Sequence, residues 1–312
     1  MSRSTSIRVM STASSLVLVV LAVLTGLAGC GDKTGRLELT SDQIELKERE
    51  AIERLKEAGC NVAEVDDPLI GTPGIMVTLY GEHFTTAGTI RNEVMSNFRY
   101  LRNLFLVVDA TPISADGLAQ LRTLNNLLLV SAQWTMTNNK GLSSIEGIVS
   151  LRLLRLNWTP LTDDGLQHIE RLPELRMLYL SGTRVTDEVV KYIKVLKRLK
   201  ALQLSHTGIT DSGLAALQGF ADLTHLGLDG TVVSDVSIPV LTSFESLQYL
   251  NIADSELTAD GMKKLRAALP ECEIVTVAKT RPELPTLKHP GQKLPTAEPP
   301  VQEKTSEAKP AE

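Results

Sequence analysis

Apolar residues recur along the middle of the chain with a period of 24 residues. Seven consecutive segments align without a gap, and they start at residues 103, 127, 151, 175, 199, 223 and 247. With the residues of each segment numbered from 1, positions 1, 4, 6, 11, 16, 19 and 22 are apolar in 47 of 49 cases. The exceptions are Asn103 and Thr137. A register this regular indicates an internal repeat in which every unit has the same fold.

The spacing of the apolar positions changes inside each unit, and this change predicts the local structure. Positions 4 and 6 alternate as in a short strand, whereas positions 16, 19 and 22 recur at helical spacing. Each unit is therefore predicted to be a strand, a turn and a helix. One unit cannot bury its apolar face alone, so neighbouring units are expected to stack with parallel strands on the inner face of an arc.

The repeat resembles the leucine-rich repeat family over roughly residues 75–277. The family pattern L-x-x-L-x-L-x-x-(N/C/T)-x-L is matched, for example, by Leu199, Leu202, Leu204, Thr207 and Ile209. The resemblance implies an α/β solenoid with a curved parallel sheet on the concave face and helices on the convex face. Position 9 holds Thr or Ser where the family often has Asn, and this hydroxyl is expected to bond backbone groups at the end of the strand.

Positions 12 to 16 often read Thr-Asp-x-Gly-Leu, as in residues 162–166 and 210–214, which resembles a recurrent bacterial subtype of the family. Thr or Asp at this place suits the N-cap of a helix, and Asp suits the positive end of the helix dipole. A calcium site in the Asp column is the alternative, but no second carboxylate column faces it and calcium needs about six or more oxygens. The column consists of Asp163, Asp187, Asp211 and Asp235.

The N-terminus has the layout of a secretory signal peptide. Two arginines precede an apolar stretch over residues 16–27, which is shorter than the roughly 20 residues that span a bilayer. The sequence Leu-Ala-Gly-Cys ending at Cys30 resembles the bacterial lipobox. The resemblance implies cleavage after Gly29, diacylglycerol on the Cys30 thiol, and acylation of the new amine by a fatty acid such as palmitate. An ordinary signal peptide with a chance cysteine is the alternative.

This resemblance implies a lipid-anchored protein of the bacterial cell envelope. Gly31 differs from the Asp that marks inner-membrane retention in the best-known sorting rule, so the outer membrane is favoured, on its periplasmic or its surface side. The expected organisation of the chain follows from these features. It consists of a signal peptide (1–29), a tether (30–40), an N-terminal cap with an irregular first repeat (41–102), the repeats with a C-terminal cap (103–278), and a tail (279–312).

Both flanks of the repeat are predicted to cap its core. A helix over residues 41–58, with Asp42 and Glu45 as a capping box and Gly59 at its end, precedes an extended piece over residues 61–65. The first repeat, around Val77 and Leu79, is five residues longer than the others, and a final helix and strand are expected over residues 265–275. The tail has seven prolines, no aromatic residue, and six Lys or Arg against five Glu, which is typical of a disordered segment.

Charge and cysteine content narrow the possible partners and cross-links. The net charge of −5 gives no support for a nucleic-acid partner. Cys60 and Cys272 fall in opposite caps, on the order of 35 Å apart at about 4.8 Å per unit, whereas a disulfide needs Cα atoms within about 7 Å. Both are expected to be buried thiols.

A basic run over residues 191–200 is interpreted as a solvated face, with contact to an anionic surface as the alternative.

The positions that face away from the core on each strand are 3, 5, 7 and 8, and they are the candidates for ligand binding. They hold five of the chain's twelve aromatic residues, including both tryptophans, which should lie about 5 Å apart. Trp, Tyr and Arg dominate binding hot spots, although the indoles could instead merely cover the sheet edge near the turns. The predicted ligand-binding residues are Phe105, Trp134, Leu153, Arg155, Trp158, Met177, Tyr179, Gln203, His206, His225, Asp229 and Tyr249.

Neither catalysis nor a cofactor is expected. His206 and His225 could approach Asp229, but the sequence offers no third ligand at metal spacing, no nucleophile beside a base and no phosphate loop.

The predicted function is protein–protein interaction by a monomer through its concave face. One alternative is cell-wall polysaccharide binding, in which both tryptophans stack on sugar rings while Asn157, Gln203 and Asp229 bond hydroxyls. In another, the proline-rich tail binds the partner or reaches across the cell wall, with the repeats as a spacer. The fold alone does not identify the ligand.

Overall fold

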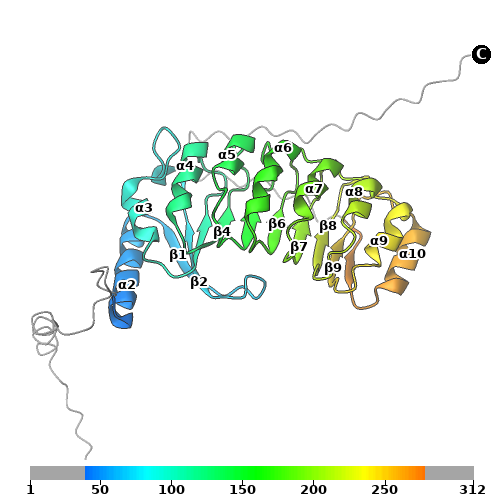
Figure 1. The fold of residues 1–312 in the computed structure, drawn as a ribbon, viewed down its shortest axis with the longest axis horizontal. Helices are drawn as coiled ribbons and strands as arrows, with labels where there is room; N and C mark the ends of the chain where they lie inside the picture. The colour runs from blue at the N-terminus through cyan, green and yellow to red at the C-terminus, as the bar shows by residue number, and fades with distance from the viewer. Residues whose placement is uncertain (1–38, 278–312) are drawn as a thin grey trace, which may run out of the picture. The chain divides into compact units, whose positions relative to one another are not determined.

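The computed structural model describes residues 39–277, so the predicted signal peptide, Cys30 and the predicted disordered tail lie outside the described residues. Of residues 1–45, which separate from the rest as a unit, only the start of helix α2 is described, and the following account concerns residues 46–277 unless stated. There, ten strands form one sheet in sequence order (Figure 1). The strands are β1 (Asn61–Val65), β2 (Gly74–Thr78), β3 (Leu104–Val107), β4 (Leu127–Ser131), β5 (Leu153–Arg155), β6 (Met177–Tyr179), β7 (Ala201–Gln203), β8 (His225–Gly227), β9 (Tyr249–Asn251) and β10 (Glu273–Val275).

From η1 onward, helices and short 3₁₀ turns follow the strands and cover the convex side of the sheet, while α2 precedes β1 (Figure 1). The α-helices are α2 (Ser41–Glu57), α3 (Asn92–Phe98), α4 (Ala115–Gln120), α5 (Asn139–Ser143), α6 (Asp163–Leu166), α7 (Val190–Ile193), α8 (Asp211–Ala216), α9 (Ile238–Leu241) and α10 (Ala259–Ala268). The 3₁₀ turns are η1 (Gly81–His83), η2 (Leu121–Thr123), η3 (Gln167–Arg171), η4 (Asp187–Val189) and η5 (Asp235–Ser237). This arrangement confirms the predicted α/β leucine-rich repeat solenoid.

The strand register confirms the 24-residue period. Leu129 lies opposite Leu153, and Leu153 lies opposite Met177, so equivalent positions of successive units pair in parallel. The first repeat is longer, as predicted, because Ile75 of β2 pairs with Leu104 of β3. Strand β1 pairs antiparallel with β2 and closes the N-terminal edge of the sheet.

The apolar columns form one continuous core, and both exceptions have a polar partner. Position 4 and 6 side chains from the strands pack against position 16, 19 and 22 side chains from the helices. Thr137 is buried with its hydroxyl 2.8 Å from that of Thr135. Asn103 adopts a left-handed backbone, with φ of 51°, and donates through Nδ2 to the Pro73 carbonyl. Asn tolerates this conformation better than the leucine of the other units, since its short polar side chain bonds locally.

The hydroxyl column at position 9 bonds the backbone as predicted. Thr135 Oγ1 donates to the Ala132 carbonyl at 2.7 Å, and Thr159 Oγ1 donates to the Leu156 carbonyl at 2.6 Å. The same bond from position 9 to position 6 recurs at Thr111, Thr183, Thr207 and Thr231. Each of these carbonyls lies just past the end of a strand, where the hydroxyl supplies a donor to a buried acceptor.

Helix N-termini of neighbouring units are joined by the Asp column. In the third to sixth units the Thr or Ser at position 12 is the N-cap, and the Asp that follows accepts hydrogen bonds from the backbone N–H and hydroxyl of the next N-cap, at 2.6 to 2.9 Å. The pairs are Asp163 with Thr186, Asp187 with Thr210, Asp211 with Ser234 and Asp235 with Thr258. Capping is therefore confirmed, and it operates between units as well as within them.

The glycine of the Thr-Asp-x-Gly motif leaves room for this link. A Cβ at Gly213 would lie 2.1 Å from Asp187 Oδ1, and one at Gly261 would lie 1.9 Å from Asp235 Oδ1. Units with glycine at position 15 begin with an α-helical turn, as in α6, α8 and α10. The two units with Val189 or Ser237 there begin with the 3₁₀ turns η4 and η5.

The N-terminal cap begins with helix α2, which ends one residue before the predicted limit. The predicted capping box of Asp42 and Glu45 is wrong: the reciprocal bonds form between Thr40 and Gln43, two residues earlier. Further along the helix, the buried Glu48 carboxylate accepts from the backbone N–H and the guanidinium of Arg102, both at 2.7 Å. This pair joins α2 to the first regular repeat.

The C-terminal cap consists of α10 and β10, and β10 extends the parallel sheet beside β9. Leu265 is fully buried, as expected for a helix that closes the core. Cys60 and Cys272 are both free thiols. The prediction of burial is right for Cys60, where burial raises the thiol pKa to about 12, and wrong for Cys272, which is only partly buried.

Candidate functional site

The connection between β1 and β2, residues 66–73, covers the N-terminal half of the concave face and is called the β1–β2 loop (Figure 1). Its Ile70 is fully buried in a second apolar cluster, which is separate from the main core. The position 3 side chains in this cluster are Phe105, Leu129, Leu153, Met177 and Ala201. Phe105, Leu153 and Met177 are among the predicted ligand-binding residues. Each points away from the main core, but the loop leaves them no more than 1% exposed.

Two arginines at position 2 hold the β1–β2 loop by its backbone. Arg152 Nη1 and Arg176 Nη1 both donate to the Ile70 carbonyl oxygen at 3.1 Å, and Arg152 Nη1 also donates to Thr72 Oγ1 at 3.0 Å. Burial, and then the like charge of Arg152, lower the pKa of Arg176. The loop thus has an apolar contact through Ile70 and a polar contact at the amino ends of β5 and β6.

Arg155 and Tyr179 mark the limit of the covered surface. The Arg155 guanidinium lies 5.3 Å from the centroid of the Tyr179 ring, in a cation–π contact between adjacent strands. Tyr179 is partly exposed and packs against the apolar cluster under the loop. Burial raises the pKa of its hydroxyl, so the phenol is neutral at physiological pH.

The tryptophans form a ring stack at position 8. The Trp134 and Trp158 rings stack with centroids 5.0 Å apart and an interplanar angle of 13°, as predicted, and the His206 ring lies 5.7 Å beyond Trp158. Gly182 and Gly230 give the rings space, because a Cβ at Gly182 would lie 2.1 Å from Trp158 Cε3. Trp158, a predicted ligand-binding residue, is only 4% exposed, whereas Trp134 is half-buried.

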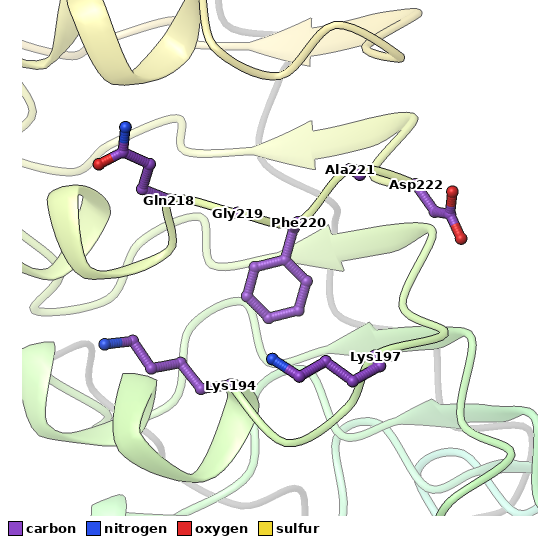
Figure 2. A pocket seen from close by; sticks show the side chains of 7 residues that line it. All are labelled: Lys194, Lys197, Gln218, Gly219, Phe220, Ala221 and Asp222. Atoms are coloured by element: carbon purple, nitrogen blue, oxygen red, sulfur yellow. The ribbon is translucent and has the colours of Figure 1, made fainter.

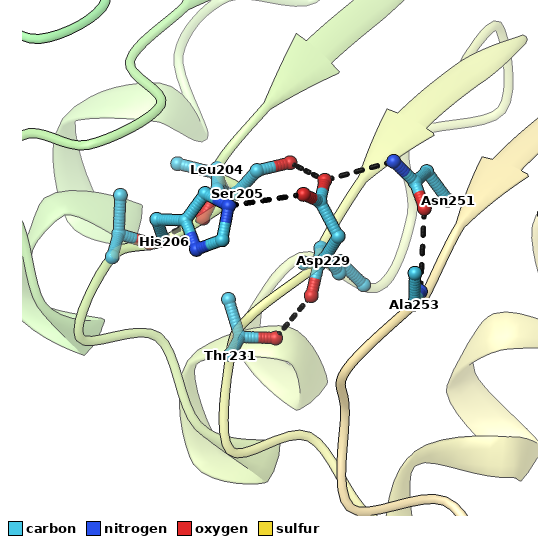
Figure 3. Close-up of polar contacts among 9 residues, drawn as sticks. Leu204, Ser205, His206, Asp229, Thr231, Asn251 and Ala253 are labelled. Atoms are coloured by element: carbon cyan, nitrogen blue, oxygen red, sulfur yellow. Dashed lines mark hydrogen bonds and ion pairs between the residues drawn. The ribbon is translucent and has the colours of Figure 1, made fainter. Parts of the chain in front are cut away.

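The C-terminal part of the concave face contains a polar network centred on Asp229 (Figure 3). Its carboxylate accepts from the Ser205 hydroxyl and from Asn251 Nδ2 at 2.9 Å, and it lies 3.3 Å from His206 Nε2. Burial opposes ionisation of Asp229, but the hydrogen bonds from His206 and Ser205 outweigh it and lower the pKa of the carboxyl. The network therefore holds a negative charge on the part of the concave face that the β1–β2 loop does not cover.

His225 and Tyr249 form a second aromatic pair beside this network. Their rings stack with centroids 5.9 Å apart, and both side chains are partly exposed. Gln203 bends over the backbone of Gly227, where a Cβ would lie 1.6 Å from its Oε1. Position 3 is apolar and covered up to Ala201, and it becomes aromatic and open at His225 and Tyr249.

A further polar network, which the sequence analysis missed, lies under the N-terminal turns. Asp109 accepts from the Ser131 hydroxyl at 2.7 Å and from the backbone N–H of Gln133 at 2.8 Å. Asn157 Nδ2 donates to Gln133 Oε1 at 2.7 Å and extends the network to the third unit. Burial raises the pKa of Asp109 despite these bonds. The signal in the sequence was a polar position 7 in successive units.

The two histidines of the candidate metal or acid–base cluster have different hydrogen-bonding partners. His206 pairs with Asp229, whereas His225 Nδ1 lies 2.9 Å from the hydroxyl of Thr224. Ser205 donates to the Asp229 carboxylate and not to a histidine. Within residues 39–277, no group of three or more His, Cys, Asp or Glu side chains is arranged to hold a metal ion.

The basic run borders a shallow surface pocket of about 250 Å³ (Figure 2). The lining residues are Lys194, Lys197, Gln218, Gly219, Phe220, Ala221 and Asp222. Both lysines are exposed, and Lys191 and Arg198 of the same run form ion pairs with Glu188 and Glu174. The run is thus exposed on the helical side, which fits the interpretation as a solvated face and leaves the anionic-surface alternative untested.

Comparison with known proteins supports the class that the sheet and its repeats define. The family model described as Leucine Rich repeat matches residues 197–217 and 245–265. With the parallel strands that recur every 24 residues, these matches support a leucine-rich repeat solenoid, a fold whose members generally bind other proteins.

Among solved structures, internalin C2 from Listeria monocytogenes is similar, with a TM-score of 0.50 and 24% sequence identity over 65% of this chain and 80% of that chain. At this identity the likeness shows the fold. No curated protein sequence matches the chain. Across the described part of the chain, no helix has the length and apolar character needed to cross a bilayer.

Proposed function

We propose that this chain is a non-catalytic, membrane-anchored leucine-rich repeat protein of the bacterial cell envelope, which binds a protein partner through the uncovered part of its concave face. We call this part the open concave surface. It consists of Arg155, Tyr179, Gln203, His225, Asp229 and Tyr249. The observation that supports it best is the change at position 3, from apolar side chains under the β1–β2 loop to the partly exposed pair of His225 and Tyr249.

The open concave surface has the composition and rigidity of a binding hot spot. Tyr and Arg bury large areas, and restraining them before binding lowers the entropy lost on association. Tyr179 is restrained by Arg155, Tyr249 by His225, and Asp229 by three neighbouring side chains. The side chains of this surface therefore need little rearrangement to bind a partner.

Affinity purification tests this proposal with a matched control. Tyr249→Ala and His225→Ala should reduce recovery of the partner at least tenfold, the scale of a hot-spot truncation of about 1.4 kcal/mol or more. Tyr192→Ala, on helix α7 of the opposite side, should leave recovery unchanged. Equal recovery from all three variants, each with a thermal unfolding temperature near that of the wild type, would exclude the concave surface as the binding site.

The membrane anchor is the second part of the proposal, and it rests on the lipobox resemblance at Cys30. Cys30→Ser should abolish incorporation of a labelled fatty acid and move the protein from the membrane fraction to the soluble fraction. Cys60→Ser is the control, since the Cys60 thiol is buried in the N-terminal cap. Density-gradient separation of the two membranes then tests the preference for the outer one. Fatty-acid labelling that persists in Cys30→Ser would refute the anchor.

A further inference from the structure

Ile70 is bound to the concave face by two groups of the same residue. Its side chain is fully buried among Phe105, Leu153 and Met177, and its own carbonyl oxygen accepts from both Arg152 and Arg176 at 3.1 Å. A carboxyl-terminal residue has the same geometry, because its side chain and its carboxylate are attached to one Cα. The site therefore combines an apolar pocket with a two-arginine clamp at the spacing of a single residue.

The clamp is better suited to a carboxylate than to the carbonyl that it holds. Guanidinium groups form their strongest hydrogen bonds with carboxylates, which accept from two donors and neutralise the charge. In residues 39–277 neither Arg152 nor Arg176 forms an ion pair with a carboxylate, and the nearby Glu174 pairs with Arg198. Arg152 Nε is buried without a hydrogen-bond partner. Two positive charges thus converge on one neutral oxygen.

The rest of the β1–β2 loop is bonded mostly to itself. Asp67 Oδ1 accepts from the backbone N–H groups of Leu69 and Ile70, and the Asp67 carbonyl accepts from the N–H of Gly71. Gly71, with φ of 76°, turns the chain away directly after Ile70. The loop can therefore leave the sheet with its internal bonds intact, and only the contacts of residues 69–73 with the repeats are lost.

We propose that Ile70 occupies a binding site for the carboxyl-terminal residue of a partner polypeptide, an aliphatic residue whose free carboxylate binds Arg152 and Arg176. This inference rests on the proposed function, since it assumes a protein partner, but it concerns a different part of the concave face. The β1–β2 loop is then an internal competitor, which the partner's terminus displaces.

Peptide binding tests the inference without the natural partner. The probe is a fluorescein-labelled pentapeptide with the sequence of residues 66–70, which ends in isoleucine with a free carboxylate. Matched peptides are its C-terminal amide and a version ending in alanine. The proteins are the wild type, Ile70→Ala, which weakens the internal competitor, and Ile70→Ala with Arg152→Gln and Arg176→Gln. Circular dichroism verifies that each variant is folded.

The free-acid peptide should bind Ile70→Ala at least tenfold more tightly than it binds the wild type. It should also bind Ile70→Ala at least tenfold more tightly than the amide or the alanine peptide does. The two arginine substitutions should remove the difference between acid and amide. Equal affinity for acid and amide, or no binding to folded Ile70→Ala, would overturn the inference. The partner-recovery experiment on Tyr249 would be unaffected, so the two proposals fail separately.

Hydrogen exchange on the wild type gives a second measurement that needs no variant. Excess free-acid peptide should accelerate exchange in residues 66–73 by displacing the loop, while the amide peptide should leave the rate unchanged. Exchange that is insensitive to the acid peptide at concentrations that saturate the wild type would contradict displacement.

Discussion

At the scale of single residues, position 8 determines how neighbouring units meet at the turns. All seven position 8 residues have positive φ, from 51° at Asp254 to 67° at Gly182. A non-glycine residue in this conformation costs roughly 1–2 kcal/mol, so Trp134 and Trp158 are held there against their backbone preference. Their stacked rings help to offset this cost, since aromatic pairs contribute about 0.5–1.5 kcal/mol beyond area burial. Trp158 therefore has a structural role, although the sequence alone suggested a surface ligand site.

Gly182→Ala tests this stack. The new Cβ meets the Trp158 ring at a backbone position with φ of 67°, so we expect a loss of about 2–4 kcal/mol from strain and overpacking together. The near-ultraviolet circular dichroism of the coupled indoles should also weaken, and it is easily assigned because the chain has two tryptophans. Gly147→Ala is the control, since φ is 92° there but nothing lies within 4 Å of its Cβ. Equal losses in urea unfolding of both variants would contradict a role for the ring contact.

At the scale of elements, the repeat could be predicted and the β1–β2 loop could not. Strands and helices followed from apolar spacing, because each unit buries the same columns against its neighbours. The loop contains only two adjacent apolar residues, Leu69 and Ile70, between prolines, and no local pattern states where they pack. The arginines that bond to Ile70, Arg152 and Arg176, lie 82 and 106 residues further along the chain. For this reason Phe105, Leu153 and Met177 were named as ligand-binding candidates, and the loop that covers them was not predicted.

The link between helix N-termini gives a second prediction. Asp211→Ala removes the acceptor for Ser234 and for the buried Ser237, so we expect a loss of roughly 1–3 kcal/mol. Asp211→Asn should lose less, because Asn139 occupies the same position in another unit and bonds both groups of Thr162. Urea unfolding measures both losses. A larger loss in the Asn variant than in the Ala variant would contradict the proposed geometry.

The same variants have a defined pH dependence. Burial opposes ionisation of Asp211, but bonds from Ser234 and Ser237 outweigh it and lower the pKa of the carboxyl in the folded state. The unfolded value is about 3.9, so the stabilising contribution is fully present above that pH and is lost as pH falls through the lower folded value. The stability difference between wild type and Asp211→Asn should therefore shrink below about pH 4. A difference that grows on acidification would show the opposite pKa shift.

At the scale of the whole molecule, a stack of identical units leaves two open ends, which the caps must close. The positions of both caps could be predicted, because the register ends there, but their contacts could not. Glu48 is buried against Arg102, and a glutamate in a charged helix gives no sign of which surface it will meet. The cap is thus joined to the repeats by an ion pair as well as by apolar side chains such as Leu55.

Glu48→Ala tests how much this contact stabilises the array. It leaves the Arg102 backbone N–H without its acceptor, so the free energy of unfolding should fall by about 1–3 kcal/mol. Glu50→Ala in the same helix removes an exposed pair with Arg54 and should cost no more than about 0.5 kcal/mol. Thermal and urea unfolding measure both changes. Similar small losses in the two variants would mean that the cap is held by apolar contacts alone.

The β1–β2 loop also affects the elasticity of the array. In a solenoid each unit contacts only its neighbours, so the array can change its curvature through small shifts at many interfaces. Because the loop joins the cap to Arg152 and Arg176, we expect it to stiffen the strands that it crosses. Among the described residues, the position 3 side chains after Ala201 do not belong to the cluster under the loop, so we expect the strands there to be more compliant. A partner that needs a different curvature would therefore obtain it at the compliant C-terminal end, beside Tyr249.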